Sequence, residues 1–169
     1  MAKRLRPVTA EFLAEAPTRL VSTARLRAEP GAVFAELTDD ASTWPLWFRE
    51  VRSAAYTGPP PYGVGAGRAV TLRGGARFVE SVVAWEEPPG GPFRFGYRVE
   101  EANVPGVRAW AEEWLLTPSA GGGTELRFTI AADTAPAVGA VLALARPGVA
   151  RSFRRAAARL DGRCGLKAD

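Results

Sequence analysis

Residues 39–50 read DDASTWPLWFRE and gather two tryptophans and one phenylalanine around a proline. Pro45 fixes its backbone φ angle, which makes this short segment stiff. Trp44, Trp47 and Phe48 therefore place a large apolar surface on a rigid piece of chain. Two interpretations are open: the rings fill a solid core, or they form one wall of an internal cavity close to its entrance.

The composition is that of an ordinary globular domain. The chain has 169 residues, of which 47% are apolar and 24% are charged, and this is enough for one domain with a real core. The net charge of +4 comes almost entirely from arginine, and six arginines fall between residues 146 and 163. We interpret these arginines as the solvated face of a helix. A basic helix is also typical of contacts with nucleic acid or anionic lipid.

Several classes of site are excluded by residues that the chain lacks. With no histidine and a single cysteine, Cys164, it cannot build a Ser-His-Asp triad, a His-ligated zinc site, a thiolate cluster or an internal disulfide. The GVGAG sequence at 63–67 lacks the spacing of a dinucleotide loop, and we expect neither a metal nor a cofactor. The sequence has no secretory signal pattern and no apolar run of membrane-spanning length. We expect a cytoplasmic bacterial protein that is a monomer or a homodimer.

The hydrophobic pattern predicts an antiparallel sheet. Segments of alternating apolar and polar residues are separated by turns rich in Gly and Pro, which is typical of strands that follow one another in antiparallel order. A sheet covered on one side by helices is an α+β fold. The expected strands are residues 19–28, 49–57, 68–73, 76–85, 93–99, 108–116 and 124–130.

Helical spacing of apolar residues predicts two short helices after the first strand, one starting at Pro30 and one across the Trp-Pro-x-Trp segment. It also predicts a long helix at 135–161, which Pro147 and Gly148 should kink or interrupt. The inner face of this long helix is expected to be the stripe Val138, Val141, Leu142, Ala145, Val149, Phe153, Ala157 and Leu160.

Three pieces of sequence carry a resemblance to a known family. They are EPGAVFAELTDDASTWPLWFREV at 29–51, YGVGAGRAV at 62–70 and EWLLTPSAGGGTELRF at 113–128, followed by the terminal helix. In this order they resemble the START-like or Bet v 1-like (SRPBCC) superfamily, and in particular its polyketide cyclase/dehydrase members. The resemblance implies a helix-grip fold, in which a curved antiparallel sheet of six or seven strands wraps around the C-terminal helix and leaves a hollow for lipids, polyketides or other apolar molecules. It implies no particular reaction.

The resemblance covers about residues 19–162, and we expect a single domain at 19–163. Residues 1–18 are expected to be an N-terminal extension with a short helix at about 8–16. Residues 164–169 are expected to be a frayed C-terminal tail that carries Cys164.

The predicted hairpin turn at 74–75 decides which side chains point inward. If these two glycines form the whole turn, Arg68 lies opposite Ser81. Arg77 then faces the interior and Glu80 faces outward, since successive side chains of a strand alternate between its faces. A slip of one residue would invert this assignment.

Polar groups inside an apolar interior are the candidates for function. Strand alternation turns Tyr97 and Glu112 inward together with Arg77. Because an unpaired buried charge is costly, Arg77 and Glu112 either pair with each other, reach solvent at the rim of the sheet, or meet the polar end of a ligand. Arg77, Glu112 and Tyr97 are the candidate catalytic groups.

Two functions fit this sequence. The first is non-catalytic binding of a small hydrophobic molecule, with no nucleic-acid partner and no membrane span. The second is a polyketide cyclase, aromatase or dehydratase, in which Arg77 or Arg68 would stabilise an enolate and Glu112 or Tyr97 would move protons. The ligand-binding residues expected in both cases are Trp44, Trp47, Phe48, Arg68, Val70, Leu72, Arg77, Val79, Ser81, Trp85, Phe95, Tyr97, Trp110, Glu112, Trp114, Phe128, Val138 and Leu142.

Overall fold

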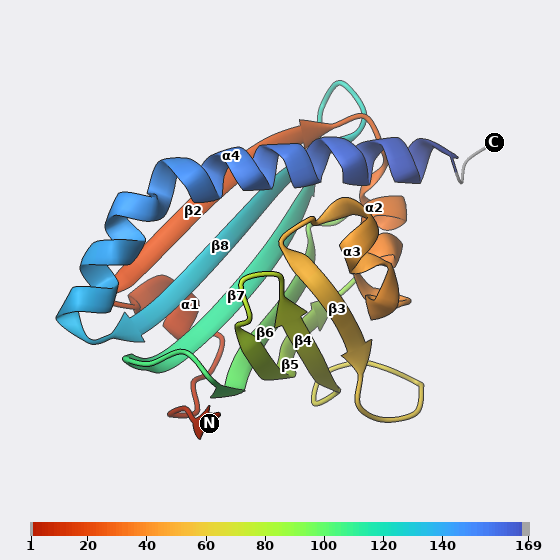
Figure 1. Cartoon of the computed structure of the whole chain (residues 1–169). Helices are drawn as coiled ribbons and strands as arrows, with labels where there is room; N and C mark the ends of the chain where they lie inside the picture. Colours follow the sequence, from red (N-terminus) through yellow and green to blue (C-terminus); the bar gives the residue numbers. More distant parts are fainter. Residues whose placement is uncertain (1, 167–169) are drawn as a thin grey trace.

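The structure is a computed structural model that describes residues 2–166 (Figure 1). Along the chain these residues form β1 (Lys3–Arg4), α1 (Phe12–Glu15), β2 (Thr18–Leu26), α2 (Pro30–Thr38), the 3-10 turn η1 (Ala41–Thr43), α3 (Trp44–Trp47), β3 (Val51–Tyr56), β4 (Gly67–Leu72), β5 (Arg77–Glu86), β6 (Phe93–Ala102), β7 (Val107–Pro118), β8 (Thr124–Thr134) and α4 (Pro136–Leu166).

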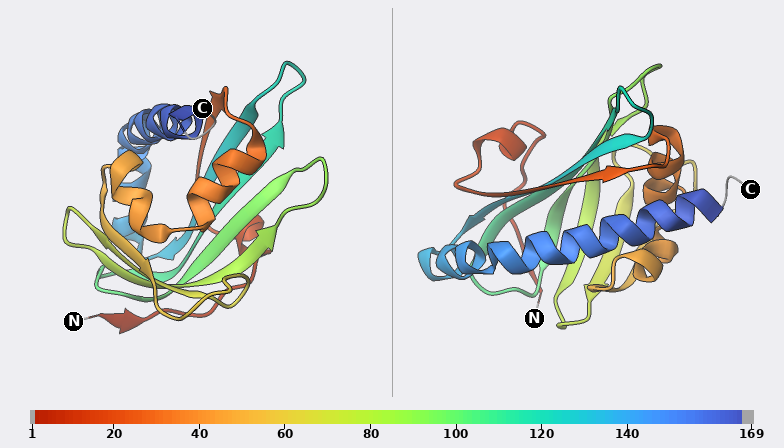
Figure 2. Two further views of the ribbon diagram at one scale, coloured as in Figure 1. Left: turned by 90° about the vertical axis from the view of Figure 1, so that its right-hand side faces the viewer. Right: turned by 90° about the horizontal axis from the view of Figure 1, so that it is seen from above.

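Strands β2 to β8 form one antiparallel sheet in the order β2-β8-β7-β6-β5-β4-β3, and the short β1 pairs with β6. Strands β3 to β8 follow one another as chain neighbours, whereas β2 joins the far edge by pairing with β8. The sheet curves around the space that holds α2, α3 and α4 (Figure 2). This confirms the predicted helix-grip fold, including the seven predicted strands and the two short helices that follow β2.

Helix α4 crosses the concave face of the sheet as one continuous helix with Pro147 inside it. Its ribbon bends in the first part (Figure 1), as expected because an internal proline removes a helical hydrogen bond and clashes with the preceding turn. In the second part, Phe153, Ala157 and Leu160 are buried as predicted.

The first part of α4, residues 136–145, consists only of Pro, Ala, Val, Gly and Leu. Val141 was predicted to face inward, and this is wrong, because it is 64% exposed. Leu144 nearby is 83% exposed. Val138 and Leu142 are half-buried and face the sheet. When a helical segment is apolar all round, the spacing of its apolar residues no longer indicates which side is buried.

The C-terminal end of α4 is held to α2 and the residues just before it by polar contacts. The Asp161 carboxylate accepts hydrogen bonds from the backbone N–H groups of Arg27 at 2.8 Å and Ala28 at 2.9 Å. Two residues further along α4, Arg163 Nε donates to the buried carboxylate of Glu36, near the end of α2, at 2.8 Å. These contacts fix one end of the helix against the body of the protein.

Cys164 lies in the last turns of α4 rather than in a frayed tail, which corrects the prediction. Its side chain is buried, and its Sγ is 3.7 Å from the carbonyl oxygen of Ala32. The helix continues to Leu166. Residues 167–169 of the predicted tail lie outside the described residues.

The N-terminal segment covers the convex face of the sheet, opposite α4 (Figure 2). Leu5 packs where β6 extends beyond its pairing with β7, against Val99 and Ala102. Val8 and Leu13 pack on a flat part of the outer face, which β7 and β8 make with the small side chains of Ala109, Ala111 and Ala131.

The hairpin between β4 and β5 has a three-residue turn. The Leu72 N–H donates to the Ala76 carbonyl oxygen at 2.8 Å, so the turn consists of residues 73–75 and not of two glycines. Gly75 has a φ of 87°, a left-handed conformation that glycine adopts without strain and that commonly closes such turns.

The longer turn shifts the pairing by one residue and inverts the faces of β5. Arg68 pairs with Glu80, and Glu80 is buried although it was predicted to face outward. Phe78 turns inward with it. The residues wrongly predicted to face inward are Arg77, Val79 and Ser81, of which Arg77 and Val79 are exposed.

Replacing Asp161 with alanine is expected to loosen α4. Two backbone N–H groups would lose a charged acceptor, so the free energy of unfolding should fall by about 1–3 kcal/mol. Arg154→Ala, on the exposed side of the same helix, should change it by less than about 0.5 kcal/mol. Urea denaturation followed by tryptophan fluorescence measures both, and equal stability of the two variants would contradict the anchoring role of Asp161.

Candidate ligand cavity

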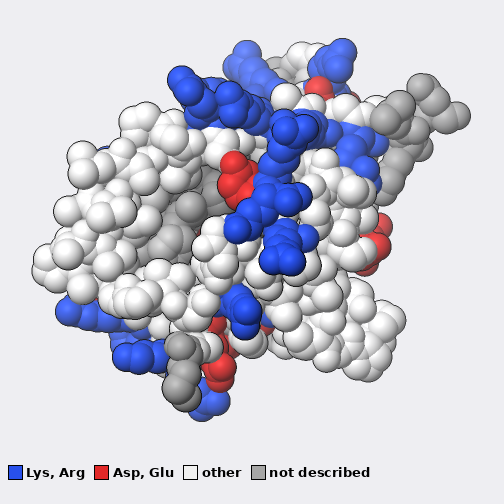
Figure 3. Space-filling view, in the orientation of Figure 1, with Lys and Arg blue, Asp and Glu red and all other residues white. Residues whose placement is uncertain are grey.

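A cavity of about 490 Å³ lies between the concave face of the sheet and α4. Figure 3 shows the molecule hollowed beneath the first part of this helix, within a region of mostly uncharged side chains. The residues predicted from the sequence that line the cavity are Trp44, Phe48, Arg68, Val70, Leu72, Tyr97, Trp110, Glu112, Phe128, Val138 and Leu142.

The other lining residues come from three sources. Phe78 and Glu80 were missed because of the shifted register of β5. Ile130, Val149 and Phe153 lie on apolar faces that the sequence pattern did indicate, although they were not named as site residues. The remaining positions, in turns and at element ends or on the helix flank, carry no periodic signal: Glu50, Val51, Val104, Val107, Gly148 and Ser152.

The aromatic rings of α3 both fill the core and form a cavity wall. Trp44 and Phe48 line the cavity, whereas Trp47 is fully buried behind them. The Trp44 indole N–H donates to the carbonyl oxygen of Leu37 at 3.0 Å, which fixes this ring. The ring of Trp114 on β7 lies edge-on to Trp44 and to Trp47, at 5.7 Å from each.

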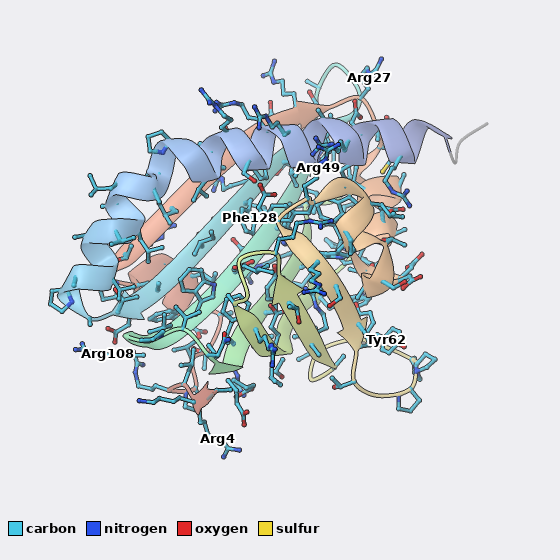
Figure 4. The ribbon with its side chains drawn as sticks, viewed as in Figure 1. Arg4, Arg27, Arg49, Tyr62, Arg108 and Phe128 are labelled. Carbon is cyan, nitrogen blue, oxygen red and sulfur yellow. The ribbon has the colours of Figure 1, made fainter. Side chains whose placement is uncertain are left out.

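The opposite wall is built by β8 and α4. Phe128, labelled in Figure 4, lies between the sheet and the helix and stacks on Phe153 with ring centres 5.8 Å apart. Beyond this stacked pair, α4 presents only half-buried side chains to the cavity. The cavity therefore lies next to the stacked Phe128 and Phe153 rings, on the side of the first part of α4.

Arg68 is the buried cation of the site. Its guanidinium lies against the rings of Trp44 and Tyr97, 4.3 Å and 4.4 Å from their centres, and these two rings are edge-on to each other. Contacts with aromatic rings stabilise a desolvated cation. Arg68 Nη2 is 3.0 Å from Glu80 Oε2. None of the three guanidinium nitrogens makes a hydrogen bond of normal geometry with the described residues.

Glu112 is held by two donors on the inner face of the sheet. Tyr97 Oη donates to Glu112 Oε2 at 2.6 Å, and Trp110 Nε1 donates to Oε1 at 2.8 Å. Trp114 Nε1 in turn donates to the Tyr97 hydroxyl oxygen at 3.3 Å. These contacts orient the carboxylate with one donor on each oxygen. Arg68, Glu80, Tyr97 and Glu112 are called the polar cluster below.

Burial shifts the ionisation of the cluster. It raises the pKa of Glu80 to about 7, with Glu112 adding to the rise and Arg68 opposing it. Burial also raises the pKa of Glu112, against its hydrogen bonds and Arg68. The pKa of the Tyr97 hydroxyl is raised well above its usual value by burial and by both carboxylates. With a pKa of about 7, Glu80 changes its charge near neutral pH.

The other predicted site residues lie away from the cavity. Arg77, Val79 and Ser81 are on the outer face of β5, and Arg77 uses its backbone N–H to bind the Asn103 side chain at 2.7 Å. The remaining rings belong to the core around the cavity: Trp47, Phe95 and Trp114 are fully buried. Trp85 is turned inward by a bulge in β5 and packs on Phe34 and Phe95.

Residues 17–165 match the family described as polyketide cyclase / dehydrase and lipid transport. The chain belongs to this family. Its fold and its apolar cavity agree with the family description, while the polar cluster is a feature of this chain's own residues.

Relatives of this chain occur in mycobacteria. An uncharacterized protein of Mycobacterium tuberculosis is 31% identical over 145 residues, which are 85% of this chain and 83% of the relative. A START superfamily protein from Mycobacterium smegmatis has the same fold, with a TM-score of 0.67 and 12% identity over 88% of this chain and 97% of that one. So does the Zhui aromatase/cyclase from a Streptomyces species, with a TM-score of 0.69 and 15% identity over 90% and 96% of the two chains.

Within residues 2–166, the Asp, Glu and Cys side chains do not come together in groups of three that could hold a metal ion. In the same part of the family member, none of the helices combines the length and the apolar character that crossing a bilayer requires.

The raised pKa of Glu80 predicts a pH dependence of stability. Since the folded protein holds this proton more tightly than the unfolded chain does, the free energy of unfolding should fall as pH rises from about 4.5 to about 7, in total by on the order of 3 kcal/mol. In Glu80→Gln the part of this decrease that comes from Glu80 should be missing. Denaturant unfolding of both proteins at pH 5 and at pH 8 gives the difference in their free energy of unfolding between the two pH values. If this difference is the same in both proteins, the prediction is wrong.

Proposed function

We propose that the protein binds a small hydrophobic molecule in the cavity between the sheet and α4, without catalysing a reaction. The observation that carries this proposal is a cavity of about 490 Å³ between the sheet and α4, lined mostly by apolar side chains. The family description, which names polyketide cyclases and lipid transport, agrees with an apolar guest.

The energetics of binding favour such a guest. Val138, Leu142 and Val149 of α4 are only half-buried although they face the cavity, so a ligand would remove further apolar surface from water. Burial of apolar surface stabilises a complex by about 25 cal/mol per Å² before the cost of association is subtracted. The volume lies within the range of roughly 300–1,000 Å³ that is usual for small-molecule sites.

Leu142 and Leu144 provide a matched pair of variants to test the cavity. Leu142 lines it, whereas Leu144, two residues further along α4, is 83% exposed. Leu142→Trp is expected to fill part of the cavity and weaken binding of the neutral fluorescent probe N-phenyl-1-naphthylamine at least tenfold, about 1.4 kcal/mol. Leu144→Trp should leave the dissociation constant unchanged. Fluorescence titration measures both.

Circular dichroism of the two tryptophan variants controls for loss of fold. If both variants bind the probe with the dissociation constant of the unchanged protein, the probe does not bind in the cavity that Leu142 lines. If the unchanged protein neither binds the probe nor gains thermal stability from any lipid, sterol or aromatic polyketide, the proposed function is wrong.

A cyclase, aromatase or dehydratase is the second candidate. One observation favours it: the cavity wall holds Glu80, whose pKa of about 7 suits general acid–base catalysis at neutral pH. Beside it the Tyr97 hydroxyl donates a hydrogen bond to Glu112. Arg77 has no part in such a reaction, because it lies on the outer face.

A turnover assay with a poly-β-ketone thioester, followed by the absorbance of aromatic products, tests this candidate. Glu80→Gln is expected to lower the rate by about 10²-fold or more, as the loss of a general acid–base does. Arg77→Ala should leave the rate unchanged. Failure of the unchanged protein to form product would remove the cyclase candidate and leave the binding function intact.

A further inference from the structure

The polar cluster at the cavity wall limits the chemistry of the ligand, given the proposed function. We propose that the ligand presents a hydrogen-bond-donating head, such as a hydroxyl, a phenol or a protonated amine, to Glu80 and Glu112, and that the site disfavours a carboxylate. The inference follows from the charge balance of the cluster and from which of its groups the cavity exposes.

The charge balance of the cluster is negative. Arg68 contributes one positive charge, and Glu80 and Glu112 contribute one negative charge each when ionised, which leaves a net charge of −1. An anionic head placed beside the cluster would make the total charge −2. In surroundings of low dielectric, like charges repel strongly. A neutral donor adds no charge, and an ammonium group brings the sum to zero.

The accessible groups of the cluster are acceptors. The Arg68 side chain has no exposed surface, since the rings of Trp44 and Tyr97 lie against its guanidinium and Glu80 Oε2 is 3.0 Å from its Nη2. The Glu80 side chain keeps 5% exposure, and Glu112 is only partly buried although it lies on the inner face of the sheet. The carboxylates are therefore the charged groups of the cluster with exposed surface, whereas the Arg68 side chain, although it belongs to the cavity wall, has none.

Other charged groups do not reverse this balance. The lining contributed by α4 contains no charged residue, and its one polar side chain is the hydroxyl of Ser152, which has no hydrogen-bond partner among the described residues. On β6 the Tyr97 hydroxyl stays neutral at ordinary pH because its pKa is raised. The remaining charged lining residue is Glu50, which is exposed and adds a further negative charge.

Three probes that share one apolar body test the inference. They are 2-naphthylmethylamine, 2-naphthylmethanol and 2-naphthoate, whose heads keep their charges between pH 6 and pH 8. Displacement of N-phenyl-1-naphthylamine gives their dissociation constants. At pH 8 the amine and the alcohol are expected to bind at least tenfold more tightly than the carboxylate.

The pH dependence identifies the group responsible. A carboxyl group with a pKa of about 7 is ionised in about a tenth of molecules at pH 6 and in about nine tenths at pH 8. Between these values the amine should therefore bind up to about tenfold more tightly and the carboxylate up to about tenfold more weakly. Binding of the alcohol should change by less than about twofold.

Glu80→Gln should remove most of this pH dependence, and Arg77→Gln on the outer face of the same strand should leave it intact. If Glu80→Gln does not fold, the pH profiles of the three probes on the unchanged protein still decide. A carboxylate that binds as tightly as the alcohol at pH 8 would overturn the inference while leaving the binding function in place. If none of the naphthyl probes nor N-phenyl-1-naphthylamine binds, the proposed function itself fails.

Discussion

The packing of Trp114 against rings of α3, β8 and α4 determines where the protein is solid and where it is hollow. Trp114 is fully buried on β7, and its ring meets Trp44 of α3, Phe128 of β8 and Phe153 of α4 at centre distances of 5.7, 4.3 and 6.1 Å. Contacts of this kind add to the free energy gained from burying the rings. They draw the sheet, the short helix and the second part of α4 together at one end of the concave face. At the other end the first part of α4, residues 136–145, carries no aromatic side chain, and the cavity remains there.

The same asymmetry runs along α4. Its second part is held by the Phe153 ring and by the charged contacts of Asp161 and Arg163, whereas its first part has neither large buried rings nor charged groups. Periodic spacing predicted the buried side of the helix correctly where polar residues mark the opposite face. It failed at Val141, where both faces are apolar, because the hydrophobic effect alone is not directional.

The fold could be predicted from the sequence because strand alternation, turn residues and the spacing of the aromatic segment all indicate one architecture. Much of the cavity wall followed from the same alternation on β6, β7 and β8. Of the polar cluster, Arg68, Tyr97 and Glu112 were also expected inside, whereas Glu80 was not, because one extra residue in the turn at 73–75 moves Glu80 inward and Arg77 outward. A period of two makes every side chain of a strand depend on its register, and the tolerance of glycine for several turn types left that register open.

The position of Arg68 bears on how the site works. Strand alternation placed an arginine inside, and an interior cation invites a role in stabilising an enolate. The guanidinium instead lies against two aromatic rings and beside Glu80, with Glu112 also acting on the cluster. Its charge already offsets carboxylates of the protein, and electrostatic catalysis requires a field directed at charge that develops on the substrate. Because the carboxylates already offset its charge, Arg68 stabilises two acidic groups inside an apolar cavity. This geometry favours binding of a hydrogen-bond donor over stabilisation of an anion.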